Sequence, residues 1–343
     1  MAKLADVTSE VRIILKILAG ALVTIVALFL FLKGGQIFKA LFFPTPPAPP
    51  KMEFGKLPNP SFPKQNKLSL DYQINTVDGQ LPPLPDRINV YKVVTNEPSL
   101  VALDNARSSL RGVGFTQGEE KINDSIYQWS NTTGVNVQYN IFTNNFQVSS
   151  DVASSPPPLG ISLTNDILLQ SATNLLDNLS ENSSDINQAN YKVIYLALQN
   201  GQLGKVSSAD QAQAAQINLF QNPINKYQVY YQETDSSSMN FIFEDEGGFP
   251  KLVYGKYFHF TPDLKTFSDY PIKTAQQAFE DLKNDNAYVS TTLKDGETAD
   301  ILNVALGYYI GEKNESYFLP VIVFSGNNFT AYVNAIPAEL ISQ

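Results

Sequence analysis

Few residue types in this chain can carry catalytic or metal chemistry. Its 343 residues contain no cysteine and a single histidine, His259. Without cysteine there is no thiol nucleophile, no disulfide and no Cys-ligated metal. His259 lies on a predicted strand among aromatic residues, and the sequence contains no Gly-x-Ser-x-Gly motif that would supply a nucleophile. We therefore expect a structural histidine, with a pH-sensing role as the alternative because imidazole titrates near neutrality.

Three adjacent carboxylates, Glu244, Asp245 and Glu246, precede Gly247-Gly248. Carboxylate oxygens suit a hard cation, so a cation site is one interpretation. The ligands of an EF-hand loop alternate along the chain, however, and a distal Glu completes the set. The spacing here therefore favours a solvated hairpin turn.

Other acids stand in predicted turns without a spacing pattern, namely Glu233, Asp235, Asp263 and Asp269. Glycoside hydrolysis needs only two carboxylates that folding brings together, so a carboxylate-dependent hydrolase stays open.

Trp129 could stack on a sugar ring, although a position in the core is favoured. Gly112-Val113-Gly114 follows a predicted helix and serves as its stop, which does not fit a dinucleotide-binding fingerprint. No catalytic, cofactor-binding or metal-ligating residue is predicted, and no cofactor.

The charge balance also limits the partners. There are 24 Lys and Arg against 33 Asp and Glu, a formal net charge of −9. An acidic chain is poorly suited to neutralising phosphates, which argues against a nucleic-acid partner. Five of the basic residues flank the first apolar run, so the remainder is more acidic still; they are Lys3, Arg12, Lys16, Lys33 and Lys39.

The apolar run Ile13–Leu32 is interrupted by one charge, Lys16, near its start. About 20 apolar residues suffice to cross a bilayer core of about 30 Å. We therefore predict a tail (1–12), a transmembrane helix (13–33) that contacts the lipid bilayer through Ile13 to Leu32, and a Pro-rich spacer (34–67). A cleaved signal peptide is the alternative. The expected location is the cell membrane, single-pass, with an extracytoplasmic ectodomain.

The remaining chain predicts an α+β fold, in which helices pack on antiparallel sheets. Proline clusters and the order of elements suggest three successive modules, 68–155, 156–250 and 251–343. The expected strands, which show alternation or are rich in β-branched and aromatic residues, are 68–74, 87–94, 125–130, 135–142, 146–149, 192–198, 217–220, 227–231, 239–243, 251–260, 301–310, 317–324 and 329–335.

One helix is expected in each module. The first opens at Pro98 and stops at Gly112, and the second runs from about Asn165 to Leu179. The third spans 275–283 and follows a capping box of Thr274 and Gln277.

The last module carries a family resemblance. Its segments Tyr270–Leu282, Phe318–Gly326 and Phe329–Val333 resemble uncharacterised single-pass membrane proteins of bacteria and, more distantly, the YycH/YycI and PepSY-type extracytoplasmic regulatory domains. In those domains a helix with an Ala-rich face packs on a sheet that ends in a Pro-Val-x-x-Phe strand and a hairpin. The resemblance implies a tethered regulatory or protein-binding ectodomain, and it transfers no functional residue.

The leading hypothesis is therefore a membrane-anchored, extracytoplasmic, sensor-like ectodomain without catalytic activity that binds another envelope protein. A cell-wall carbohydrate binder or hydrolase is the second hypothesis, and a structural subunit of an envelope complex is the third. Carboxylates clustered in a concavity beside accessible aromatic rings would favour the second.

Overall fold

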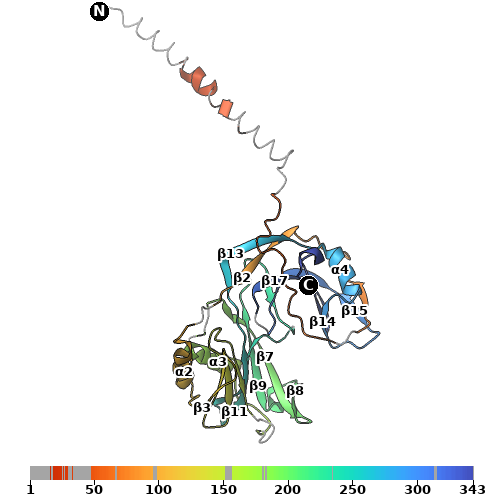
Figure 1. Cartoon of the computed structure of the whole chain (residues 1–343). Helices are drawn as coiled ribbons and strands as arrows, with labels where there is room; N and C mark the ends of the chain where they lie inside the picture. Colours follow the sequence, from red (N-terminus) through yellow and green to blue (C-terminus); the bar gives the residue numbers. More distant parts are fainter. Residues whose placement is uncertain are drawn as a thin grey trace, which may run out of the picture. The chain divides into compact units, whose positions relative to one another are not determined.

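The structure is a computed structural model, and its chain divides into two units, Met1–Pro49 and Pro50–Gln343 (Figure 1). The residues that it describes are 16, 18–24, 26, 28–29, 33, 48–65, 68–95, 99–150, 157–179, 181, 184–233, 235–312 and 315–342.

The described residues of the first unit between Lys16 and Lys33 are helical. Among all residues that the structure describes, no helix is both long enough and apolar enough to cross a membrane. The predicted tail 1–12, much of the predicted span 13–33 and the first part of the spacer lie outside the described residues, so the transmembrane helix stays a prediction.

The second unit contains an antiparallel nine-stranded sheet, called the large sheet below. Alternating apolar residues form most of its strands. In order across the sheet they are β3 (Gln117–Lys121), β4 (Ile126–Ser130), β5 (Asn136–Asn140), β6 (Phe146–Ser149), β12 (Pro250–Tyr257), β11 (Met239–Asp245), β9 (Ala214–Gln221), β7 (Ile186–Gln199) and β8 (Gln202–Val206).

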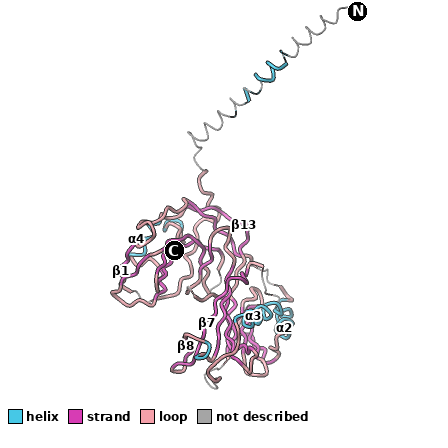
Figure 2. Tube along the Cα trace, turned by 180° about the vertical axis from the view of Figure 1, so that it is seen from behind, coloured by secondary structure: helices cyan, strands magenta, loops and turns pink. Residues whose placement is uncertain are grey.

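Two helices cover one face of the large sheet, α2 (Ala102–Gly112) and α3 (Asn165–Leu179) (Figures 1 and 2). In α3 the buried residues Leu168, Ala172, Leu176 and Leu179 recur every three or four positions and form one apolar stripe. They share a single core with the apolar residues of the sheet. We call this side of the sheet its covered face and the other side its open face.

A second, seven-stranded sheet, called the mixed sheet, contains one parallel pair, β10 with β16. Its strands are β10 (Gln228–Tyr230), β16 (Asn303–Tyr309), β17 (Tyr317–Gly326), β18 (Phe329–Asn334), β14 (Tyr288–Thr291), β2 (Arg87–Val93) and β13 (Pro262–Pro271). The pair β1 (Asp71–Ile74) and β15 (Thr298–Ile301) forms a separate parallel ribbon, and the short 3₁₀ turns are η1 (Ala209–Gln211) and η2 (Ala338–Leu340).

Helix α4 (Ala275–Lys283) lies against β18 of the mixed sheet. The predicted capping box is present: Thr274 Oγ1 accepts from Gln277 N at 3.2 Å, and Gln277 Oε1 accepts from Thr274 N at 2.9 Å. The predictions of an α+β fold, of this helix and of α3 are confirmed. The first helix begins at Ala102, while its predicted opening residue, Pro98, lies outside the described residues.

The prediction of three consecutive modules is wrong, because each sheet takes strands from more than one of them. Strand β12, at the start of the third module, pairs with β6 of the first and β11 of the second. Strand β2 of the first module pairs with β13 and β17 of the third. Strand periodicity fixes which face a side chain takes but says nothing about which strand becomes its neighbour.

The predicted spacer 34–67 also extends too far. The compact unit begins at Pro50, and Leu57 is fully buried within it. Leu57 N donates to Leu340 O at 2.8 Å, and the Phe62 ring packs 4.8 Å from that of Tyr309. Burial of these apolar residues makes 50–65 part of the folded unit.

The chain passes between the two sheets several times. Strand β10 of the mixed sheet falls in sequence between β9 and β11 of the large sheet, and β13 follows β12. The connections 222–227, 231–238 and 258–261 therefore lie where the two sheets meet, and 231–238 borders the open face.

Candidate functional site

Strand β9 shows how the large sheet separates two kinds of side chain. Ala215, Ile217 and Leu219 belong to the core that includes α3, whereas Gln216 and Asn218 between them point to the open face. These two positions of the open face are therefore polar, and they lie beside a small apolar cluster of Leu196, Ala214, Ile242 and Val253.

Polar residues of the neighbouring strands lie in register with Asn218 and form a row across the open face. The register places Asn218 between Lys192 of β7 and Asn240 of β11, and Asn240 beside Lys256 of β12. The two asparagines are almost fully buried, at 0% and 6% exposure. Buried amides at such positions need hydrogen-bond partners.

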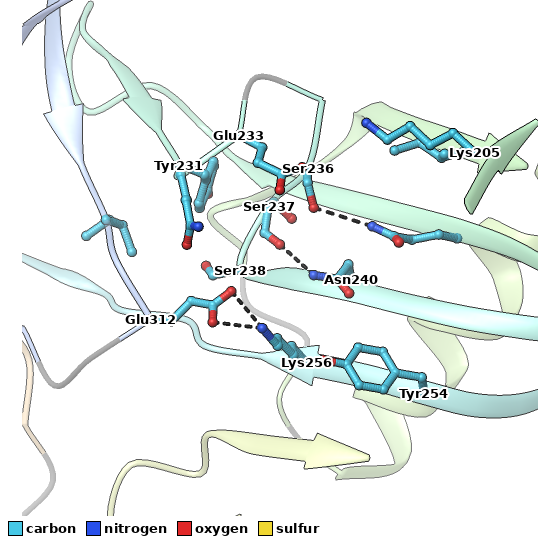
Figure 3. Close-up of a pocket in the computed structure, with 14 residues that line it drawn as sticks. Lys205, Tyr231, Glu233, Ser236, Ser237, Ser238, Asn240, Tyr254, Lys256 and Glu312 are labelled. Carbon is cyan, nitrogen blue, oxygen red and sulfur yellow. Dashed lines mark hydrogen bonds and ion pairs between the residues drawn. The ribbon is translucent and has the colours of Figure 1, made fainter. Parts of the chain in front are cut away.

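The connection 231–238 supplies those partners, and Figure 3 shows the one that Ser237 provides to Asn240. Asn218 Oδ1 accepts from Ser236 Oγ at 3.1 Å and from Ser237 N at 3.3 Å. Asn240 Nδ2 donates to Ser237 O at 2.6 Å, and this contact fixes the orientation of the amide. Asn240 lines the cavity of Figure 3, and among the described residues its Oδ1 has no partner.

Three cavities adjoin here, with volumes of about 340, 560 and 240 Å³, and Glu233 lines all of them. The first lies on the open face of the large sheet, the second reaches β14 and the third reaches β10 and β18. Because each pair of cavities shares Glu233 and one further lining residue, we regard the three as one groove between the open face and the mixed sheet. We call it the groove; its lining includes Tyr230, Glu233, Asn240, Tyr254, Lys256 and Tyr288.

Two ion pairs neutralise most charges of the groove. Lys256 Nζ contacts both oxygens of Glu312 at 2.8 and 2.9 Å (Figure 3). Lys192 Nζ donates to Asp235 Oδ1 at 2.6 Å, and this hydrogen bond holds the pKa of Asp235 below its usual value. Both carboxylates are therefore held by a lysine.

One further charge of each sign lines the groove, Lys205 and Glu233. Within the described part of the chain neither makes an ion pair. Counting the paired residues, the groove holds three lysines and three carboxylates, so its formal charges cancel.

The wall formed by the mixed sheet is aromatic. Tyr288 and Tyr332 stack with ring centroids 5.9 Å apart, and Tyr230 meets Tyr332 edge to face at 6.1 Å. Burial raises the pKa of Tyr230 and Tyr288, so these hydroxyls stay protonated. Behind them Tyr309 is 2% exposed, and among the described residues its hydroxyl has no hydrogen-bond partner.

The acids singled out in the sequence are only partly brought together. Glu233 and Asp235 both line the groove, joined there by Glu312. Asp269 instead pairs with Arg87 at 3.1 Å, and Asp263 Oδ1 accepts from Lys265 N at 3.0 Å within its own turn. Of the four scattered acids, two therefore belong to the candidate site.

Trp129 lies in the core, at 3% exposure, and its Nε1 donates to Glu119 Oε2 at 3.3 Å. Its ring faces are therefore covered and do not offer a platform for a sugar. Gly112 ends α2, as the sequence indicates, and Gly114 follows with a positive φ of 91°.

His259 lies just after β12, where the two sheets meet. Its Nε2 is 2.9 Å from Asp185 Oδ1, and its ring stacks on Tyr257 at 5.7 Å. Gln221 Nε2 donates to the other Asp185 oxygen at 3.1 Å and to Phe260 O at 2.8 Å. This network links the ends of β9 and β12 to the 184–185 segment; a pH-sensing role for His259 stays a prediction.

The adjacent acids Glu244 and Asp245 lie in different surroundings. Glu244 is 7% exposed and lies 3.7 Å from Lys251 Nζ, whereas Asp245 accepts from Ser162 N and Ser162 Oγ, each at 2.6 Å. Those bonds lower the pKa of Asp245, and burial raises that of Glu244. Within the described residues no group of three His, Asp or Glu side chains is arranged to hold a metal ion.

One carboxyl that the sequence did not single out has a perturbed pKa. Glu181 follows α3 and lines a separate cavity with Tyr139 and residues of α2. Burial raises its pKa to about 8, and its carbonyl accepts from Tyr257 Oη at 2.6 Å. Glu181 belongs to the covered side of the large sheet and does not line the groove.

The sequence also did not point to Asn240, Lys256 or Glu312. The first two sit in strands predicted from their apolar and aromatic neighbours, and Glu312 follows another such strand. The available signal was the run Ser236-Ser237-Ser238 directly before a buried strand, because hydroxyls at that place must find partners.

No model of a known protein family matches the chain, and no curated protein matches it. Among solved structures, an uncharacterized protein from Eubacterium rectale is similar over 79% of this chain and 90% of its own, with 11% identity and a TM-score of 0.41. That similarity defines neither a family nor an activity. The resemblance to YycH/YycI and PepSY-type domains stays a prediction.

Proposed function

We propose that the chain is a single-pass, membrane-anchored protein of the bacterial cell envelope whose extracytoplasmic ectodomain binds a ligand in the groove. The observation that carries the proposal is the groove itself: three adjoining cavities, with Glu233 common to all, between an open polar sheet face and an aromatic wall. Concave sites with a few convergent polar groups are the usual form of ligand sites.

The apolar N-terminal run supports the anchor. Side chains of its described helical residues are exposed, including Leu22 at 63%, Val23 at 68% and Phe29 at 59%. A helix that presents apolar side chains on all sides calls for an apolar surrounding, which a bilayer supplies.

The charge pairing supports binding over hydrolysis. A hydrolase needs one carboxyl free to donate a proton and a second one free to act as base or nucleophile. Asp235 and Glu312 are each held by a lysine, so Glu233 remains as the one carboxylate of the groove without an ion pair in the described structure. We therefore propose a regulatory or sensing role, in which occupancy of the groove is the signal.

A contact with another envelope protein is the second candidate, and strand β8 (Gln202–Val206) favours it. This strand ends the large sheet and carries a single charge, Lys205. The other edge, β3, is fully exposed and holds Glu119, Glu120 and Lys121, a composition that discourages pairing. A partner strand added at β8 is thus the form that this contact would take.

Single cysteines test the proposal, because the chain has none of its own. Val77→Cys, at an exposed loop position, should react with a membrane-impermeant maleimide in intact cells, whereas Ala2→Cys should react only after lysis. An unreactive Val77→Cys with a reactive Ala2→Cys would contradict the orientation.

Glu233→Cys tests occupancy in the same experiment. It should react at least threefold more slowly in intact cells than in the purified chain, while Val77→Cys reacts alike in both. Equal rates for Glu233→Cys in cells and in the purified chain would show an empty groove and remove the proposed function.

A further inference from the structure

We infer that the ligand of the groove is a neutral, hydroxyl-rich chain, that is, a segment of a glycan. The inference rests on the proposed function, in which the groove is the binding site. It follows from the charges of the groove, its unpaired hydrogen-bonding atoms and its aromatic surfaces.

The cancelled charges exclude strongly charged ligands. A polyanion binds where cations are in excess, and a polycation where carboxylates are. Lys256 is held by Glu312 and Lys192 by Asp235, so neither lysine is free to neutralise a phosphate. The net charge of −9 on the chain adds a further repulsion for an anionic polymer.

The hydrogen-bonding groups left over among the described residues are two acceptors, Asn240 and Glu233, and one cationic donor, Lys205. Asn240 is 6% exposed, its amide nitrogen is engaged by Ser237 O, and its Oδ1 lines the groove without a partner in the described structure. The exposed Glu233 carboxylate is a second acceptor in the same cavity. Hydroxyl groups donate to such oxygens, and a buried acceptor left unmatched by its ligand weakens binding.

Two half-buried tyrosines give the groove aromatic surfaces on which a sugar ring can pack. Tyr254 lies on the open face in the first cavity, and Tyr230 lines the third, next to β18. A sugar ring presents C–H groups on its faces and hydroxyls at its rim, so it can pack on a tyrosine ring while its rim reaches polar atoms. Because the two rings lie in different cavities that share Glu233, the site suits more than one sugar unit.

An extended peptide fits this floor less well. Peptides that bind sheets pair with the backbone of an edge strand. The floor of the groove is the face of β7, β9, β11 and β12, whose backbone groups already bond each other in the sheet. Only side chains remain to recognise the ligand. Those with an unpaired group in the described part of the chain, Asn240, Glu233 and Lys205, do not reproduce the evenly alternating donors and acceptors of a strand backbone.

The test is calorimetric titration of the full chain, purified in a detergent without a sugar headgroup. The probes are the hexamers of N-acetylglucosamine and of glucose, inorganic polyphosphate and a library of neutral decapeptides. At least one hexamer should bind, with a Kd raised tenfold or more by Tyr254→Ala. Tyr127→Ala, a half-buried tyrosine of β4 outside the groove, is the matched control and should leave the Kd unchanged.

Glu233→Ala is the second variant, and because Glu233 is exposed its loss leaves the fold intact. It should weaken hexamer binding about fivefold. Binding of neither hexamer, tighter binding of polyphosphate or peptides, or unchanged affinity in both groove variants would each overturn the inference. If Glu233→Cys is nevertheless protected in intact cells, the groove keeps its proposed function and only the glycan assignment fails.

Discussion

The two faces of the large sheet use the same strands for different purposes. On the covered face, Phe241 and Phe243 of β11 are buried against the core that contains α3. On the open face, Asn240 of the same strand holds the 231–238 connection and lines the groove. The larger core lies on the covered face, whereas the open face combines a smaller apolar cluster, which includes Ile242, with the polar atoms that can meet a ligand.

Successive side chains of a strand point to opposite faces of the sheet, so one strand supplies residues to both faces. This arrangement also separates the consequences of substitution. A change on the covered face should cost stability, and a change on the open face should cost binding while the fold persists.

The largest expected effect comes from opening a cavity under the helices. Phe241 is fully buried and its ring lies 6.2 Å from that of Phe146. Phe241→Ala should lower the free energy of unfolding by about 3–5 kcal/mol, from lost apolar burial and the cavity left behind. Urea denaturation followed by tryptophan fluorescence measures this.

Tyr254→Ala is the partner substitution on the open face. Since Tyr254 is half-buried, its loss should cost about 1–1.5 kcal/mol. Comparable losses for Phe241→Ala and Tyr254→Ala would remove the distinction between the two faces.

The second effect concerns Glu181 on the covered side. Its pKa is about 8 in the fold, raised by burial, against roughly 4.3 in an unfolded chain. The folded state thus keeps a proton that the unfolded state releases, and stability should fall as the pH rises from about 4.5 to 8.

Glu181→Gln should flatten that profile and be more stable than the unchanged chain by about 1–3 kcal/mol at pH 8.5, allowing for partial exposure, and similar to it at pH 4.5. Thermal unfolding across this range provides the measurement. Glu233→Gln, an exposed acid of the groove, is the control and should leave the profile as it was. A Glu181→Gln profile parallel to that of the unchanged chain would show that Glu181 is ionised in the fold.

The mixed sheet has a helix of its own, α4, whose stability depends in part on its N-terminal cap. Thr274→Ala removes the side-chain cap of α4, which lies against β18, and should cost about 1 kcal/mol. Thr274→Ser keeps the hydroxyl and should cost less than half as much. Equal losses for both variants in chemical denaturation would show that the cap is not the cause.

Much of the fold could be predicted because its signals are local. The stripe of α3, the capping box of α4 and the strand at Phe146–Ser149 depend on neighbours a few residues away. Strands β3 and β8 carry polar residues at sheet edges and show no alternation, so they were missed. Strand order was also missed, because β2 meets β17 across more than 200 residues of chain.

The site was less predictable for the same reason. Glu233 and Asp235 were noticed as acids, but their proximity to Lys256 and Glu312 results from strands that meet only in the folded chain. Asn240 gives no signal of its own, since its role depends on a register with Asn218 and on the Ser237 carbonyl.

The smallest expected effect on stability belongs to the groove. Glu312→Gln breaks the ion pair with Lys256. The side chain of Lys256 is 23% exposed and that of Glu312 is 39% exposed, so the loss should lower the free energy of unfolding by less than about 1 kcal/mol. It leaves one positive charge uncompensated, so affinity for inorganic polyphosphate should rise while stability hardly changes. If Glu312→Gln lowered the free energy of unfolding as much as Phe241→Ala does, the ion pair of Lys256 and Glu312 would be part of the stabilising core and not of the binding surface.

The most direct test of the central claim is photocrosslinking in living cells. A benzophenone amino acid is placed at Glu233 in the groove or at Leu264, a residue of β13 that is 60% exposed and does not line the groove. Irradiation should give a discrete heavier species from position 233 and none from position 264. No adduct at 233, or the same adducts from both positions, would contradict the claim that the open face of the large sheet is where this protein binds its ligand.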